Sequence, residues 1–103
     1  MKTLGCFAVG SAIAFAVGTA HAQANDPANV RMLASACSNC HGTEGRSQAA
    51  IPGLAGRSKT ELVGIMKAFK DGSRSATIMH QIAKGYTDEQ IDAISLYFSR
   101  IKP

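Results

Sequence analysis

Cys37-Ser38-Asn39-Cys40-His41 is the stretch of this sequence that decides the fold. Two cysteines with this spacing lie about one helical turn apart, so both thiols face the same side. The imidazole of the next residue, His41, lies on that same side of the helix. This string is a signal for a c-type haem, in which the two thiols bond the porphyrin and the histidine binds its iron. We therefore predict one covalently bound haem, attached through Cys37 and Cys40, with His41 as an iron ligand.

Three other uses of such a cysteine pair stay open. A thioredoxin-like redox pair requires a preceding strand and a βαβ unit, and the sequence has no run of alternating strand residues. A structural zinc site requires four ligands, but from residue 23 onward the motif is joined only by His80. Because an exported chain meets an oxidising environment, a plain Cys37–Cys40 disulfide is the third alternative.

The first 22 residues are typical of a secretory signal peptide. Lys2 gives a positive start, residues 4–17 form an apolar stretch, and residues 20–22 are a small-x-small cleavage site. The apolar stretch is shorter than the roughly 20 residues that span a bilayer, which disfavours a membrane anchor. We therefore expect cleavage after Ala22, a periplasmic domain of residues 23–103, and no stable membrane insertion after cleavage.

The charged residues give the chain a formal net charge of +4. Lysines and arginines stand in small dispersed groups at residues 57–59, 67–70 and 100–102, with no basic block. Because nucleic-acid interfaces show a basic patch or stripe, we do not expect nucleic-acid binding. The charges are better explained as a solvated surface that helps to steer partners.

Helix signals account for most of the chain from residue 23 onward. Asp26, Ser58 and Thr87 are good N-cap residues, and the last two open capping boxes of the forms S-x-x-E and T-x-x-Q. Residues 42–56 contain glycines and a proline without a sustained period, which predicts a long loop. The expected helices cover residues 28–36, 59–70, 78–84 and the stretch after Thr87. We therefore predict an all-α domain of three to five short helices wrapped around the haem.

The far face of the haem iron needs either a second ligand or an open position. Met32 lies too close to the motif in sequence to cross the ring, and Met66 lies within a helix among apolar residues, where a thioether is usually a core filler. Met79 lies far enough beyond His41 for the chain to pass around the haem. We therefore predict Met79 as the second iron ligand. His80 is the rival, and bis-His ligation would lower the reduction potential whereas methionine raises it.

An iron closed by Met79 indicates outer-sphere electron transfer, and an enzyme with an open iron position is the alternative. The aspartates and glutamates form no carboxylate pair that we can place as an acid and a base, so we predict no catalytic residues. An iron-bound imidazole usually donates its other N–H to a carbonyl or carboxylate. We therefore expect the carbonyl of Pro52 to orient His41, with an ordinary turn proline as the alternative.

Taken in order, the cysteine motif, the loop at residues 51–56, Met79 and the final helix resemble a class I cytochrome c. Within that class the chain is similar to cytochrome c4-type domains, and in particular to the cytochrome subunit of flavocytochrome c sulfide dehydrogenase. Residues 68–74 and 77–91 carry the narrower resemblance, above all residues 82–86.

This resemblance implies a small class I cytochrome c fold and the haem-binding set Cys37, Cys40, His41 and Met79. It also implies a single-haem periplasmic subunit that accepts electrons from an FAD-containing, sulfide-oxidising flavoprotein. The alternative is a free soluble cytochrome c that shuttles electrons to other redox proteins, such as a terminal oxidase or reductase. One departure concerns the crossing of the terminal helices, because Asn29 stands where many class I cytochromes have a glycine.

Overall fold

The computed structural model describes residues 25–103, and the expected signal peptide at residues 1–22 lies outside the described residues. Within the described part the chain forms four α-helices and one short 3-10 helix, without a strand. In chain order they are α1 (Pro27–His41), η2 (Thr43–Gly45), α2 (Lys59–Asp71), α3 (Met79–Lys84) and α4 (Asp88–Ser99). The prediction of an all-α domain with three to five short helices is confirmed. No helix in residues 25–103 is long and apolar enough to cross a membrane.

The capping signals of α2 and α4 behave differently. At α4, Thr87 and Gln90 form the complete reciprocal box, with each side chain accepting the other residue's backbone N–H. At α2, Ser58 accepts the N–H of Glu61, but the Glu61 carboxylate accepts from the Arg57 guanidinium. The expected box at α2 is therefore half formed, because an arginine just before the helix competes for the carboxylate.

Helix α1 is longer than expected and contains the whole cysteine motif. The expected helix covered residues 28–36, whereas the observed one continues to His41. The sequence contains no glycine or proline from residue 28 to 41, and the first breaker is Gly42. Gly42 has a φ of +82°, and a Cβ there would lie 2.8 Å from the Arg46 backbone. The two thiols and the imidazole therefore stand on one regular helix.

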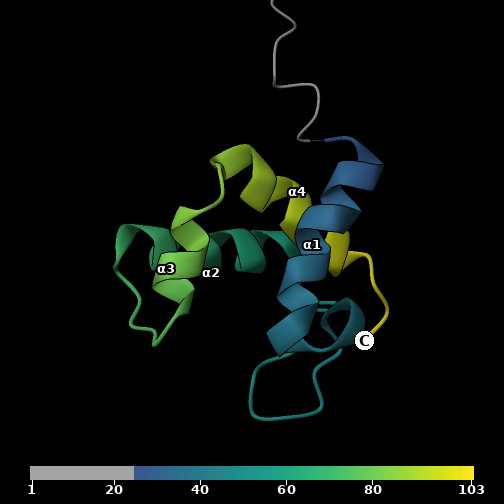
Figure 1. Ribbon diagram of the computed structural model, residues 1–103, viewed down its shortest axis with the longest axis horizontal. Helices are drawn as coiled ribbons and strands as arrows, with labels where there is room; N and C mark the ends of the chain where they lie inside the picture. Colours follow the sequence, from purple (N-terminus) through teal and green to yellow (C-terminus); the bar gives the residue numbers. More distant parts are fainter. Residues whose placement is uncertain (1–24) are drawn as a thin grey trace, which may run out of the picture.

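The core brings the terminal helices together. It consists of Ala34, Leu62, Ile94 and Phe98, which come from α1, α2 and α4. Helix α1 contacts α4, and α2 contacts both α3 and α4. Figure 1 shows α1 and α3 on opposite sides of the molecule. At the departure noted above, Asn29 is half-buried, and the small α1 side chain in the core cluster is Ala34 instead, at 1% exposure.

The second half of the long loop between α1 and α2 is hydrogen-bonded to η2 and to the end of α4. The carbonyl of Gly45 accepts the N–H groups of Leu54 and Ala55, at 2.7 and 3.2 Å. The N–H of Gly56 donates to the carbonyl of Phe98 at 3.0 Å. These bonds fix residues 54–56 against η2 and the end of α4, which limits the movement of Pro52 two residues earlier.

Candidate haem site

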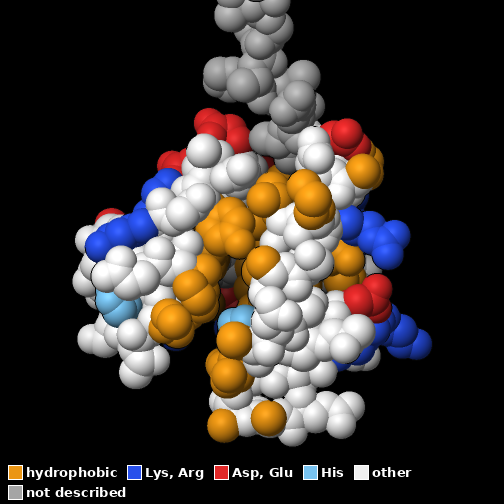
Figure 2. Space-filling model, in the orientation of Figure 1, with side chains coloured by type: hydrophobic (Ala, Val, Ile, Leu, Met, Phe, Trp, Pro, Cys, Tyr) orange, Lys and Arg blue, Asp and Glu red, His pale blue; other side chains and the backbone are white. Residues whose placement is uncertain are grey.

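An apolar cavity of about 350 Å³ lies among α1, α2, α3, α4 and the loop before α2. Figure 2 shows hydrophobic side chains on both sides of the groove that opens on this face of the molecule. The lining includes Cys37, Cys40, His41 and Met79, which are the four residues that the sequence predicted as the haem-binding set. The structure therefore brings all four to one cavity, from two helices that lie far apart in sequence.

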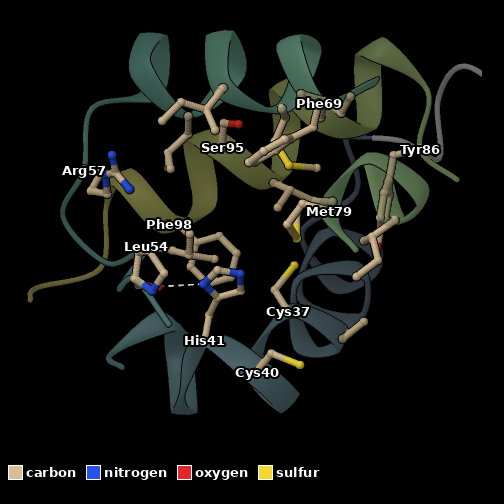
Figure 3. Close-up of a pocket in the computed structure, with 18 of the residues that line it drawn as sticks. Cys37, Cys40, His41, Leu54, Arg57, Phe69, Met79, Tyr86, Ser95 and Phe98 are labelled. Atoms are coloured by element: carbon tan, nitrogen blue, oxygen red, sulfur yellow. Dashed lines mark hydrogen bonds between the residues drawn. The ribbon is translucent and has the colours of Figure 1, made fainter. Parts of the chain in front are cut away.

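His41 has one ring nitrogen engaged and one available. Its Nδ1 lies 2.6 Å from the carbonyl oxygen of Pro52, as the dashed line in Figure 3 marks. Because a carbonyl oxygen can only accept, the proton of the neutral imidazole sits on Nδ1, and Nε2 keeps its lone pair for a metal. The contact expected between His41 and the Pro52 carbonyl is thus present, and the tied loop described above supplies its rigidity.

The two thiols stand on the last turn of α1 and are both free. Cys37 is half-buried and packs against the core cluster, whereas Cys40 is exposed. Burial raises the pKa of the Cys37 thiol, with a smaller opposing effect from a backbone hydrogen bond. Figure 3 shows Cys37 beside the His41 ring and below Met79, with Cys40 below both. They are placed to attach one planar group along one edge.

Two methionines reach the cavity, and one of them, Met66, is a core residue by its sequence pattern. Met66 on α2 lines the cavity together with Met79 at the start of α3. Figure 3 shows Met79 on one side of the cavity and His41 on the other. His80 is half-buried, is absent from the cavity lining, and has a buried Nδ1 without a hydrogen-bond partner among the described residues. Met32 is 66% exposed on the outer side of α1.

Several lining residues were not foreseen from the sequence. Arg57 and Arg74 are the two permanent cations in the lining, which holds no aspartate or glutamate. They are suited to the two propionates of a haem. Ser95 on α4 is the one buried polar side chain among residues 25–103, and Figure 3 shows it at the cavity. A serine on the apolar side of α4, next to Ile94, was the available signal.

The described residues lack the features that a thioredoxin-like pair or a zinc site would need. Residues 25–103 contain no strand, so the βαβ surroundings of a thioredoxin-like pair are missing there. Within the same range, no three His, Cys, Asp or Glu side chains gather as a metal site of the zinc type. A histidine aimed into an apolar cavity, two thiols on one edge and two cations are what a covalently bound haem needs.

A family model described as cytochrome c matches residues 28–102. The chain belongs to the cytochrome c family. Its all-helical fold is that of a class I cytochrome c, and its cofactor is one covalently bound haem c with iron. The alternatives of a redox pair, a zinc site and a bare disulfide are thereby replaced by the haem.

Three known proteins resemble this cytochrome c over about two thirds of its length. It is 41% identical over 70 residues to the cytochrome subunit of sulfide dehydrogenase from Chlorobaculum tepidum, covering 68% of this chain and 64% of that protein. It is 43% identical over 67 residues to cytochrome c-554(548) from Halomonas halodenitrificans, covering 61% and 81%. The solved cytochrome c4 from Acidithiobacillus ferrooxidans superposes with a TM-score of 0.62 at 35% identity, covering 64% and 38%. The chain thus spans less than two thirds of the first and third of these proteins.

Proposed function

We propose that this cytochrome c transfers electrons in the periplasm through one haem that Cys37 and Cys40 attach and that His41 and Met79 ligate. The supporting observation is the cavity itself, which His41 and Met79 enter from opposite sides with the two thiols at one edge. When bound, the haem iron supplies a one-electron couple. We also propose that residues 1–22 are a signal peptide cleaved after Ala22, which leaves the domain at residues 23–103.

The residues around the cavity suit electron transfer better than catalysis. The Pro52 carbonyl holds His41 at 2.6 Å, so the imidazole keeps its orientation whatever the charge of the iron. Met79 as the second ligand would close the iron to small molecules and would raise the reduction potential relative to a second histidine. The lining has no carboxylate that could move a proton. An open-iron enzyme is therefore the weaker proposal.

The ligand assignment is tested by the long-wavelength charge-transfer band of a thioether bound to ferric iron. Met79→Ala should abolish this band in the visible spectrum of the purified ferric protein. Met66→Ala is the matched control, because Met66 lines the same cavity from α2 and should leave the band intact. The reverse pattern would assign the ligand to Met66, and a wild-type spectrum without the band would favour His80.

The proposed electron donor is an FAD-containing, sulfide-oxidising flavoprotein subunit. The likeness to the Chlorobaculum tepidum subunit supports this partner. A second support is the exposed apolar side chains beside the cavity, namely Ile51 at 42%, Ile78 at 58% and Ile82 at 38% exposure. Ile82 lines the cavity, and the other two precede the lining residues Pro52 and Met79. Apolar surface of this kind is typical of the centre of a protein interface.

Purification of the native protein from a periplasmic extract tests the partner. We expect the haem absorbance to elute together with flavin absorbance, and sulfide to reduce the haem only in flavin-containing fractions. Ile78→Ser and Ile82→Ser should weaken the co-elution, while Met32→Ser, an exposed apolar residue on α1, should not. A haem protein that elutes alone at its own mass, without flavin, refutes the flavocytochrome proposal.

A free soluble carrier is the second proposal. It is supported by the match to the Halomonas halodenitrificans protein, of whose length the chain covers 81%. In that case the protein passes electrons to other redox proteins, such as a terminal oxidase or reductase. Elution without flavin, combined with rapid oxidation of the reduced haem by membranes from the same cells, would identify this role.

A further inference from the structure

Helix α3 carries Met79 but has little of its own to hold it in place. It is six residues long and has no side-chain cap at its N-terminus. A helix of this length is unstable in water unless tertiary contacts support it. Ala83 is its one buried residue, while Ile78 just before it and Ile82 within it are exposed. The position of α3 therefore depends on its packing against α2 and on the bonds at its ends.

Lys70, in the last turn of α2, makes a strong bond at the far end of α3. Its ammonium donates to the carbonyl of Tyr86 at 2.7 Å and to Oδ1 of Asp88 at 3.1 Å. Tyr86 follows Gly85, which ends α3, and Asp88 begins α4. One cation thus fastens the joint between α3 and α4 to α2. The Tyr86 side chain also lines the cavity, on the side where Figure 3 shows Met79.

The neighbouring lysine does not make the same connection. Lys67 lies 3.7 Å from Oδ2 of Asp88, and its side chain is 51% exposed against 31% for Lys70. Hydrogen bonding and charge from Lys70, with a smaller effect from Lys67, hold the pKa of the Asp88 carboxyl below its usual range. At neutral pH the carboxylate is therefore charged, and the Lys70 bond joins α2 to the well-packed helix α4.

The connector between α2 and α3 is bonded to the same turn of α2 at Arg74, five residues before Met79. The N–H of Arg74 donates to the carbonyl of Ala68 at 3.1 Å. The Arg74 guanidinium lies over the Phe69 ring, 5.4 Å from its centre. Residues 68–70 therefore bond the connector at Arg74, before α3, and the joint at Tyr86 and Asp88, after it. Of these residues, Lys70 makes its contacts through a charged group rather than an apolar one.

We propose that Lys70 is a positioning residue, which fastens the α3–α4 joint to α2 and thereby keeps Met79 at the iron. The inference rests on the proposed ligation by Met79. A hydrogen bond from a charged donor is worth about as much as a tenfold change in an equilibrium constant. Without it, the state in which Met79 has left the iron should become about tenfold more populated.

Imidazole binding to the ferric holoprotein measures that population, because imidazole occupies the iron only when the methionine has left. Lys70→Met keeps the side-chain length and removes the donors. We expect it to bind imidazole about tenfold more tightly than wild type, by the estimate above. Lys70→Arg keeps a cation that can reach both acceptors and should restore affinity to within about threefold of wild type. Lys70→Gln is measured in the same way if Lys70→Met yields no folded holoprotein.

Lys59→Met is the matched control. It removes another exposed ion pair from α2, between Lys59 and Asp92 at 2.8 Å, which lies away from α3. It should lower the free energy of unfolding without changing imidazole affinity. If Lys70→Met binds imidazole no more tightly than Lys59→Met, the positioning role is refuted. If Met79→Ala retains the charge-transfer band, the ligation itself is wrong, and that result is independent of every lysine variant.

Discussion

Replacing Gly45 by alanine tests how the cavity wall is built. Gly45 is buried and has a φ of +73°, in the left-handed region. A Cβ there would lie 2.8 and 2.9 Å from two ring carbons of Phe98 and 3.0 Å from the Cβ of Leu54. Both side chains line the cavity. The phenyl ring cannot move away freely, because Phe98 is 1% exposed in the core.

Two costs follow from this geometry. The left-handed conformation costs an alanine about 1–2 kcal/mol relative to glycine. Forcing a methyl group into a packed wall costs about 1–3 kcal/mol more. We therefore expect Gly45→Ala to lower the free energy of unfolding by about 2–5 kcal/mol, which is a large part of the stability of a small domain.

Denaturant unfolding of the ferric holoprotein, followed by haem absorbance and circular dichroism, measures this loss. Two other glycines separate the cost of the left-handed backbone from the cost of the close packing. Gly72 has a φ of +82° but open space around it, so Gly72→Ala should cost only about 1–2 kcal/mol of strain. Gly64, inside α2, also has nothing within 4 Å, and Gly64→Ala should stabilise by about 0.5–1 kcal/mol. If Gly45→Ala costs no more than Gly72→Ala, the close packing around Gly45 is wrong.

Three further outcomes follow from exposure and charge. In the haem-free protein, iodoacetamide should alkylate Cys40 faster than Cys37, because burial raises the pKa of the Cys37 thiol and the thiolate is the reactive form. Mass spectrometric mapping of the alkylated sites over time measures both rates, and equal rates would contradict this prediction. The pKa of Asp88 is depressed in the folded state by Lys70, so its stabilisation exists above the unfolded pKa and is lost as pH falls through the folded one. Asp88→Asn should therefore destabilise at neutral pH but hardly at a pH of about 2, and equal loss at both pH values contradicts this. Met32→Gln should change the free energy of unfolding by less than about 0.5 kcal/mol, because Met32 is 66% exposed; a larger change in denaturant unfolding would show an unseen contact.

Helix positions were predictable because their signals are local. The caps at Asp26, Ser58 and Thr87 act through bonds to residues two or three positions away, so sequence spacing alone reveals them. The errors arise where a local signal has a competitor. The Glu61 carboxylate accepts from the Arg57 guanidinium instead of completing the capping box. Helix α1 extends to His41, beyond the expected end at residue 36, because no glycine or proline interrupts it before Gly42.

The site was predictable to the extent that it is encoded in one segment. The cysteine motif fixes two thiols and one imidazole on a single helix, and the chemistry of an iron-bound imidazole pointed to a carbonyl such as that of Pro52. Ser95 and the two arginines reach the cavity only through the packing of α4 and of the segments next to α2. The sequence around the two arginines gives no sign that they reach the cavity, and for Ser95 the one sign is its place next to Ile94 on the apolar side of α4. The same reason explains why Met66 was assigned to the core but lines the cavity.

The two sides of the cavity differ in how firmly they are built. His41 belongs to a fifteen-residue helix that packs on α4, and a loop bonded to Gly45 and Phe98 holds its partner carbonyl. Met79 belongs to a six-residue helix with one buried residue, held from α2. A disturbance of the fold should therefore release the proposed methionine ligand before the histidine. Methionine ligation raises the reduction potential of the haem. The contacts that hold α3 in place therefore also maintain the potential on which the proposed electron transfer depends.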